Sequence, residues 1–449
     1  MEFSRNKKEN DQYMKLSLRN VNKIKKADIE LNGLTVIVGE NDSGKSTVGR
    51  IFFTAVKALV NTSVNDQKRT DELVKKYVVS FYQRLNKGGM SVVGERVADN
   101  LFPRVPNEFI KEIKNAVSIQ DYIKDKCHAV DMLASTPRSK SLMKADLNRI
   151  LICMTHDNDR AASLHTVFQS VAESEFLNQL GERNDGLEIS LYDELGKVVF
   201  SHHIFKDKSS TKCMEEESLQ DIVYVESPLY MHLLELLKRT QAYTETENKQ
   251  WFLSPMVPYH IKDFADKLNA PKLKSINSAF NEHSRSQPKN IVGGEFEYDR
   301  HRRTILFKKN GMELFPLNVA SGIKIFGVLQ MLLDADYINA QCPLVWDEPE
   351  NHLHPDWQVE FAKILVQLSK SGIPILITTH SPYFLQAIRY FSALEKVEDF
   401  VNYYSAEPQD DDMVEMLDVN KDLNRVFLKL ATPLNKIMNV DAARQGIEL

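Results

Sequence analysis

The sequence predicts an α/β fold in which a large, mainly helical insertion interrupts the chain of a parallel sheet. Three observations support this prediction. A glycine-rich loop lies between an apolar strand and a helix near residue 40, a second apolar strand near residue 345 ends in two acidic residues, and a third near residue 377 ends in a histidine. Because ligands collect at the carboxyl ends of parallel strands, we expect these three strand ends to meet at one edge of the sheet.

The glycine-rich loop fits the P-loop pattern G-x-x-x-x-G-K-[ST]. Residues 34–38 form an apolar, β-branched run, and residues 48–60 after the loop are apolar at helical spacing. Strand, loop and helix in this order are the context in which the motif binds phosphates. We therefore expect ATP to be bound by Gly39, Asn41, Ser43, Gly44, Lys45, Ser46 and Thr47.

The residues of this loop have separate chemical tasks. Gly39 and Gly44 let the backbone turn tightly, so that its N–H groups point at phosphates, and the helix that follows adds the positive end of its dipole. Lys45 is long enough to reach the outer phosphates, and the Ser46 hydroxyl is a ligand for Mg²⁺. These assignments predict a bound ATP with its magnesium ion.

The second segment is the apolar strand 344–347, which ends in Asp347 and Glu348. A carboxylate at this place holds Mg²⁺ in nucleotide hydrolases, and we expect Asp347 to do so directly or through water. Glu348 is then placed to orient and deprotonate an attacking water. The alternative is an acidic cap before the amphipathic helix that contains Trp357.

The third and fourth segments are shorter. The apolar strand that precedes His380 ends where a γ-phosphate would lie, although a histidine at a strand end is also a common structural group. Ser321 and Gly322 precede apolar residues at helical spacing. They are either an ordinary helix start or a helix N-terminus that binds the γ-phosphate of another subunit.

Composition sets limits on the whole chain. The 449 residues are 43% hydrophobic and 27% charged, which is typical of a globular protein of two or three structural units. The net charge of −5 gives no global field that attracts nucleic acid. We find no run of 18 apolar residues and no secretory signal, and the four cysteines are widely spaced, so we expect a cytoplasmic protein with free thiols and no membrane contact.

Local patterns predict the remaining elements. Strands are expected at 14–21 and 27–31, a polar junction at 61–72, helices without a long coiled coil from 72 to 182, a hairpin within 187–205 and a polar loop at 206–218. A strand is expected at 222–225, helices over 229–285, a hairpin at 295–298 and 304–307, and a terminal helix at 423–430. Residues 410–412 are read as an acidic surface loop.

These motifs, in this order, resemble those of ABC-class ATPases of the SMC, Rad50 and RecF group. The run Asp347-Glu-Pro-Glu-Asn-His-Leu-His-Pro355 is most similar to bacterial ATPases of the OLD type and to antiphage ATPases such as Septu, retron-associated ATPases and PARIS. The resemblance covers about residues 14–60 and 317–390. It implies an ABC-type ATPase head, with a P-loop parallel sheet and an antiparallel β subdomain.

The resemblance also implies roles for single residues. Lys45, Glu348 and His380 would form the catalytic group, Ser46 and Asp347 would hold Mg²⁺, and Ser321 with Gly322 would complete the ATP site of a second subunit. Residues 351–354 would lie near that interface. The partners implied are a second copy, in a homodimer or higher oligomer with ATP sandwiched between the heads, and nucleic acid as a possibility.

The division of the chain follows from the motifs and the resemblance. Residues 1–60 would begin the ATPase head, 61–185 would form a helical insertion, and 186–228 a hairpin and strand of the head. Residues 229–290 would form a second helical insertion, and 291–390 would complete the head with the Ser-Gly signature, the acidic pair and the histidine. Residues 391–449 would form a tail that packs on the head.

The sequence departs from this family in three places. The signature, Ala320 to Lys324, lacks the usual second glycine and glutamine. Glu226 stands where the family has a glutamine after a strand. His352 and His354 could suggest a zinc site, but no cysteine or third histidine lies nearby in the sequence to complete it. OLD proteins also carry a Toprim nuclease domain, and we recognise none in the residues after Pro382.

Two functions remain open at this point. The first is an ATP-driven switch of a bacterial antiphage defence system that controls a separately encoded effector. The second is a DNA repair or recombination ATPase, in which basic residues of two hairpins contact phosphates: Lys23, Lys25, Lys26, Arg300, Arg302, Arg303, Lys308 and Lys309. We favour ordinary surface charge for these residues. A transporter subunit does not fit the long insertion.

Overall fold

The computed structural model describes most of the chain. The described residues are 14–86, 101–103, 105–116, 118–133, 136–155, 160–177, 179–180, 186–205, 208–213, 219–234, 257–269, 282–299, 301–302, 304–409 and 411–432. They form two compact units, Met1–Val60 with Leu164–Leu449, and Asn61–Ser163. Helix α1, Lys45–Asn86, contributes to both units.

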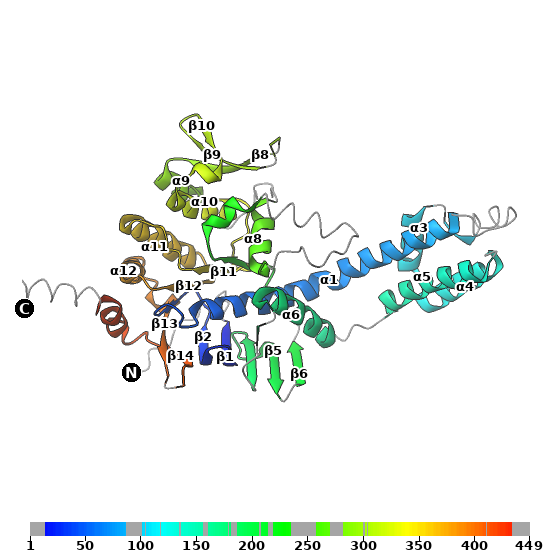
Figure 1. The fold of residues 1–449 in the computed structure, drawn as a ribbon, viewed down its shortest axis with the longest axis horizontal. Coiled ribbons are helices and arrows are strands. Elements are labelled where there is room, and N and C mark those ends of the chain that lie inside the picture. Colours follow the sequence, from blue (N-terminus) through cyan, green and yellow to red (C-terminus); the bar gives the residue numbers. More distant parts are fainter. Residues whose placement is uncertain are drawn as a thin grey trace, which may run out of the picture. The chain divides into compact units, whose positions relative to one another are not determined.

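The first unit is built around a mixed sheet of eleven strands (Figure 1). Its order is β6-β5-β4-β1-β2-β14-β13-β3-β12-β11-β7. One end is antiparallel and holds β1 (Lys15–Val21), β2 (Ile24–Glu30), β4 (Leu187–Tyr192), β5 (Val198–Phe205) and β6 (Lys208–Cys213). The other end consists of β13 (Val401–Pro408), β3 (Leu34–Val38), β12 (Ile375–Thr379), β11 (Leu344–Asp347) and β7 (Val223–Val225), which run parallel, and β14 (Val414–Asp418) joins the two ends.

Strand β3 is covered on both faces of the sheet, and its sequence reflects this. All five of its residues are buried. Val36 and Val38 belong to a core with helices α10 (Ser321–Asp334), α11 (Pro355–Lys370) and α12 (Pro382–Glu395), whereas Ile37 belongs to a core with α1 and β1. Because side chains alternate across a strand, a continuous apolar run is needed where both faces are covered.

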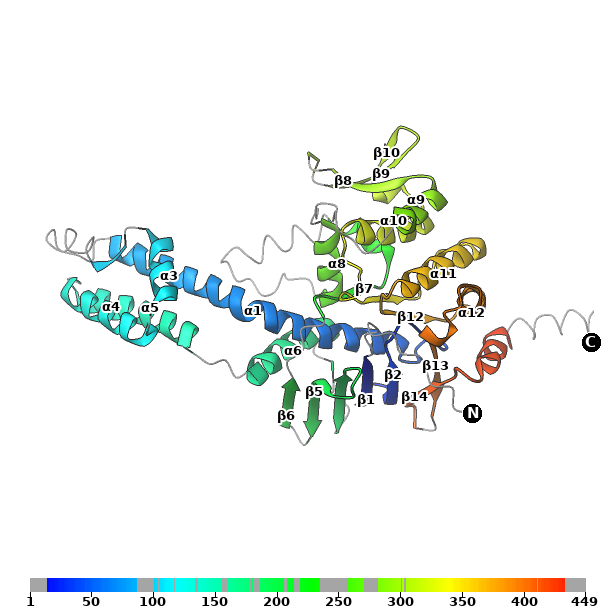
Figure 2. The same ribbon diagram turned by 180° about the vertical axis from the view of Figure 1, so that it is seen from behind.

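Helices cover the parallel end. The two views of the ribbon show α11 and α12 side by side on one face (Figure 2). Helices α6 (Arg160–Phe176), α8 (Tyr259–Asn269) and α9 (Glu282–Val292) also belong to the first unit, together with the short 3-10 helices η1 (Pro228–His232), η3 (Pro316–Asn318) and η4 (Glu398–Phe400). A separate three-stranded sheet, β8 (Glu295–Asp299), β9 (Thr304–Lys309) and β10 (Met312–Leu314), includes the predicted second hairpin.

The second unit is helical. It contains the later part of α1 with α3 (Pro106–Asn115), α4 (Ile119–Leu133) and α5 (Pro137–Thr155). Its core is rich in aromatic residues, and Phe81, Phe102 and Phe109 contact one another in it. Single aromatic contacts of this kind add to the apolar area that a small helical unit buries.

Three predictions about the elements were wrong or incomplete. Residues 61–72 are helical, because α1 continues through them to Asn86, but the boundary between the two compact units does fall at Val60 and Asn61, where the junction was predicted to begin. The polar loop 206–218 contains β6, an edge strand whose lysines and serines suit an exposed edge. The segment 391–449 is more than a tail, because β13 and β14 lie inside the main sheet.

Three further observations concern single features of the described residues. No helix in the described part of the chain combines the length and the apolar character that a membrane crossing requires. Neither Cys127 nor Cys342 is part of a disulfide. Of the acidic loop, Asp411 and Asp412 are exposed in the turn between β13 and β14, while Asp410 lies outside the described residues.

Candidate functional site

Four neighbouring parallel strands bring the predicted residues together. The strands β3, β12, β11 and β7 are adjacent and parallel, so their carboxyl ends share one edge of the sheet. The glycine-rich loop follows β3, His380 follows β12, Asp347 ends β11 and Glu226 follows β7. This is the edge at which parallel sheets bind ligands.

The glycine-rich loop turns sharply before α1. Asp42 and Gly44 have φ angles of 62° and 77°, in the left-handed region that glycine adopts without strain. The buried Lys45 folds back over the loop, and its Nζ donates to the carbonyl oxygens of Gly39 (2.9 Å) and Glu40 (2.6 Å). Burial lowers the pKa of Lys45, and the nearby carboxylate of Glu348 partly opposes this shift.

Asp347 is buried at the end of β11. Its Oδ1 accepts a hydrogen bond from the Thr378 hydroxyl of β12, and the Ser46 side chain is also bonded to this carboxylate. Burial nevertheless raises the pKa of Asp347, with a further contribution from the negative charge of Glu348. Burying a carboxylate is costly, and a bound cation would offset that cost. Together with the Ser46 hydroxyl, Asp347 offers the oxygen ligands that a hard cation such as Mg²⁺ prefers.

Glu348 leaves the strand in an unusual conformation. Its φ is 46°, in the left-handed region, and its backbone N–H donates to the carbonyl oxygen and the hydroxyl of Thr378, each at 3.1 Å. Its Oε1 lies 3.8 Å from Lys45 Nζ, and its Oε2 accepts from Asn351 Nδ2 at 2.9 Å. Strained residues held in this way concentrate at functional sites.

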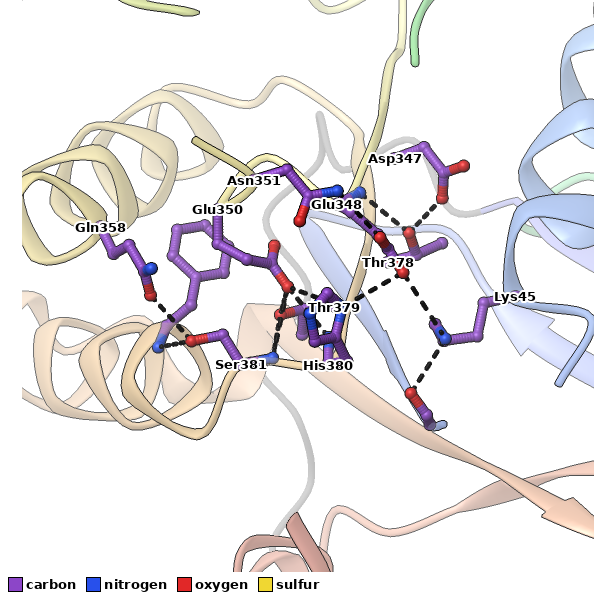
Figure 3. A network of polar contacts seen from close by, with 12 residues as sticks. Lys45, Asp347, Glu348, Glu350, Asn351, Gln358, Thr378, Thr379, His380 and Ser381 are labelled. Atoms are coloured by element: carbon purple, nitrogen blue, oxygen red, sulfur yellow. Dashed lines mark hydrogen bonds and ion pairs between the residues drawn. The ribbon is translucent and has the colours of Figure 1, made fainter. Parts of the chain in front are cut away.

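His380 lies beside two carboxylates (Figure 3). Its Nδ1 is 3.2 Å from Glu348 Oε1 and 3.6 Å from Glu350 Oε1, without hydrogen-bond alignment to either. The sequence reasoning assigned no role to Glu350 or Thr378. The third acid of the run Asp347-Glu348-Pro349-Glu350 is a sequence signal for Glu350, whereas Thr378 is identified only by its register with Asp347 in the folded sheet.

A pocket with a volume of about 490 Å³ lies at this edge. Of the predicted residues, its lining includes Asn41, Ser43, Gly44, Lys45, Ser46, Thr47, Asp347 and Glu348. Gly39, Ser321, Gly322 and His380 are not among the lining residues, although His380 contacts Glu348. Ser321 and Gly322 begin α10, which follows η3.

Glu226 also lines this pocket and is connected to the interior. His260 of α8 bridges two carboxylates, since its Nε2 is 2.8 Å from Glu226 and its Nδ1 is 2.7 Å from Glu175. Glu175 in turn accepts from Arg50 Nε at 2.6 Å. Although burial opposes the charge, the two carboxylates raise the pKa of His260. Sequence patterns do not reveal this cluster, because its members come from four separate segments.

Four of the described basic hairpin residues, Lys23, Lys25, Arg302 and Lys308, pair with acids, and Lys26 does not. Lys25 lies 2.9 Å from Asp411, and Lys308 lies 2.8 Å from Glu297. Arg302 lies 2.8 Å from Glu313, Lys309 Nζ donates to a backbone carbonyl, and Lys23 pairs with Asp42 of the glycine-rich loop. Arg300 and Arg303 lie outside the described residues. Among the residues that the structure describes, we find no group of three or more His, Cys, Asp or Glu side chains arranged to hold a metal ion.

A protein-family model matches the middle and later part of the chain. This model, described as "AAA domain, putative AbiEii toxin, Type IV TA system", matches residues 144–386, more than half of the chain. These residues include the acidic pair and His380 but begin after the glycine-rich loop.

Comparison with single proteins gives partial similarity. Protein ea59 of Escherichia phage lambda is 31% identical over 121 residues, which are 26% of this chain and 21% of that protein. The chain therefore matches about a fifth of that relative's length.

Solved structures with similar architecture are heads of SMC proteins. The SMC head domain from Thermotoga maritima is 11% identical and has a TM-score of 0.38, with 91% of this chain and 98% of that chain covered. An SMC head bound to the C-winged helix domain of ScpA is 12% identical, with a TM-score of 0.41 and coverage of 92% and 99%.

Proposed function

Because this chain belongs to the family described as "AAA domain, putative AbiEii toxin, Type IV TA system", and so carries an ATPase-type domain, we propose that it is a magnesium-dependent ATP switch. The observation that supports this most strongly is the convergence of distant segments. Lys45 Nζ lies 3.8 Å from Glu348 Oε1 at a pocket of about 490 Å³, although the two residues are about 300 positions apart.

Phosphate binding would use the Lys45 ammonium group, which in this structure is hydrogen-bonded to its own loop. Lys45 donates to two carbonyl oxygens of its own loop, Gly39 and Glu40, and lies close to a carboxylate. A triphosphate offers stronger acceptors to the same ammonium group, and the start of α1 adds backbone N–H groups. We therefore expect Lys45 to exchange its loop contacts for phosphate oxygens.

The residues around Asp347 fit a magnesium ion. The donor set is a serine hydroxyl and a buried carboxylate, both oxygen ligands, and a bound cation would relieve the electrostatic cost of burying Asp347. Ser46 and Asp347 would hold the ion, which would neutralise charge on the transferred phosphoryl group. The hydrogen bond from Thr378 keeps the Asp347 carboxylate at the strand end.

Glu348 is the residue best placed to act as general base. It is partly exposed at the pocket, and Asn351 and the Thr378 contacts hold its side chain and backbone. We propose that it accepts a proton from the attacking water and that His380, beside it, contacts the γ-phosphate. Lys45 and the backbone N–H groups would stabilise the charge that develops.

Ser321 and Gly322 would act on the ATP of a second copy. They start a helix and are not among the residues that line the chain's own pocket, which agrees with a contribution across an interface. If each of two chains placed the start of its α10 against the ATP of the other, the pair would enclose two nucleotides, and ATP would strengthen their association. Residues 351–354 would lie near this interface.

We further propose a role in bacterial antiphage defence, with control of a separate effector. The family description refers to a toxin of a TA system, which supports a partnered toxic or defensive activity. The DNA-repair alternative is less well supported, because most of the described basic residues of the two hairpins have carboxylate or carbonyl partners; Lys26 is the exception. If the protein bound DNA with an affinity that fell steeply as the salt concentration rose, the DNA-repair alternative would be supported.

Two substitutions test the proposed reaction. Lys45→Ala should lower ATP turnover roughly 100-fold or more and weaken nucleotide binding. Glu348→Gln should abolish turnover to a similar extent but retain ATP and shift the chain to a larger assembly, which light scattering with and without ATP would detect. If Glu348→Gln turned over ATP as fast as the wild type, the assignment of the base would be wrong.

The proposed effector has its own test. Affinity purification from a cell that carries the neighbouring genes should yield a discrete complex with a second protein, and Lys45→Ala should reduce it. A chain that remains a lone monomer with ATP, with ADP and without nucleotide would contradict the switch.

A further inference from the structure

Glu350 is a buried carboxylate between the acidic pair and the histidine strand. It lies between β11 and α11, and its side chain is only 3% exposed. Its Oε1 accepts three hydrogen bonds, from the Thr379 hydroxyl (2.5 Å), the His380 N–H (2.9 Å) and the Ser381 N–H (3.2 Å), as Figure 3 shows. The carboxylate therefore holds the main chain at the end of β12.

The second oxygen of Glu350 has no such role. Oε2 is buried and has no hydrogen-bond partner among the described residues. Burial raises the pKa of Glu350, against the hydrogen bonds that it accepts from Thr379 and the backbone. An asparagine or serine would anchor a strand end with a smaller desolvation cost, so a carboxylate at this position calls for an explanation beyond anchoring.

The imidazole of His380 supplies that explanation. Its Nδ1 is buried and lies 3.6 Å from Glu350 Oε1 and 3.2 Å from Glu348 Oε1, whereas 40% of the side chain is exposed. The exposed part is therefore the opposite edge of the ring. A ring nitrogen that faces carboxylates carries a proton, because the oxygens can only accept, and this sets the role of the other nitrogen.

We propose that Glu350 is a positioning residue for His380: it anchors the His380 main chain, keeps Nδ1 on the carboxylate side and leaves Nε2 for the substrate. The inference rests on the proposed ATPase function, in which His380 contacts the γ-phosphate. Glu350 also keeps a negative charge beside Nδ1 when Glu348 turns to the attacking water. One carboxylate thus orients the histidine while the other serves the reaction.

A purely structural role for Glu350 predicts a different result. Glu350→Gln keeps the volume and an oxygen for the three donors but removes the charge. We expect kcat for ATP to fall about tenfold with KM changed less than about twofold, and the same substitution to have almost no effect in a His380→Gln background. Asp356→Asn, an exposed carboxylate at the start of α11, is the matched control and should keep wild-type turnover.

The double-mutant cycle decides between the two roles. Equal loss from Glu350→Gln in the wild-type and His380→Gln backgrounds would overturn the proposal, as would full turnover in a stably folded Glu350→Gln chain. If Glu350→Gln unfolds, ¹⁵N NMR of the histidines in the wild-type protein still tests the claim, with the His380 signal identified by its loss in His380→Gln. We expect the proton on Nδ1, and a proton on Nε2 alone would overturn the proposal.

The NMR measurement also distinguishes a failure of the proposed ATPase function from a failure of the proposed role of Glu350. Wild-type turnover no higher than that of Lys45→Ala would refute the ATPase function. The tautomer of His380 is read without hydrolysis, so a proton on Nε2 alone would refute the role of Glu350 even in an active ATPase.

Discussion

Replacing Lys57 with methionine removes one of two lysines from a buried cluster of four charges. Lys57 of α1 contacts Asp221 before β7 and Asp263 of α8, each at 2.5 Å, and Lys267 of α8 lies 3.0 Å from Asp221. The lysine side chains are 6% and 5% exposed, and those of Asp221 and Asp263 are 27% and 14% exposed. Burial alone would lower the pKa of Lys57, but the two aspartates outweigh it and raise it.

The cost follows from what the substitution leaves behind. Removing one partner of a fully buried ion pair costs about 3–5 kcal/mol, because the remaining charge is neither paired nor hydrated. Here both aspartates keep Lys267 as a partner and retain some contact with water, so we expect a smaller cost than this range, about 2–3 kcal/mol. Methionine has a similar length, so the loss of packing should be small.

Urea unfolding followed by tryptophan fluorescence measures this difference. Trp346 and Trp357 both belong to the core of the first unit, so the signal follows the unit that contains the cluster. Lys25→Met is the matched control, since its partner Asp411 lies 2.9 Å away and both side chains are about half exposed. We expect less than about 1 kcal/mol for the control. A Lys57→Met chain as stable as the control would refute the reasoning.

Two further predictions concern the site. Carboxylates raise the pKa of His260 in the folded protein. The protonated ring therefore stabilises the fold fully below its unfolded pKa of about 6.5, and this stabilisation is lost as the pH rises through the folded pKa. Between pH 6 and 9 the urea midpoint of the wild type should fall more than that of His260→Gln, and an equal fall in both proteins would contradict this. Gly44→Ala and Gly372→Ala should each cost about 1–2 kcal/mol, because both glycines have positive φ (77° and 87°), but only Gly44→Ala should weaken binding of a fluorescent ATP analogue.

The parts of the fold that the sequence predicted are those with local signals. The strand at 34–38, the glycine-rich loop and the start of α1 are contiguous, so chain order and residue type alone indicate their structure. The acidic pair and His380 could be assigned to one edge because each follows an apolar run, and parallel strands end together. The α/β class and the parallel sheet are confirmed on this basis.

The parts that were missed depend on contacts between distant residues. The segment 401–408 is apolar enough to be a strand, but nothing near it indicates that it pairs with β3. The cluster of Arg50, Glu175, His260 and Glu226 combines single polar residues from four separate segments, and although Glu226 was noted for its place after a strand, nothing in the sequence links it to the other three. Polar partners of this kind become visible only when the chain is folded.

The order of the strands has a consequence for synthesis of the protein. Strand β3, which leads into the glycine-rich loop, is bordered on both sides by segments made more than 300 residues later, β12 and β13. At about 5–20 residues per second, a ribosome needs tens of seconds to supply them. During that time the backbone N–H and C=O groups along both edges of β3 lack their final strand partners and are open to chaperones or to other nascent chains. The nucleotide pocket is therefore among the last features of this protein to form.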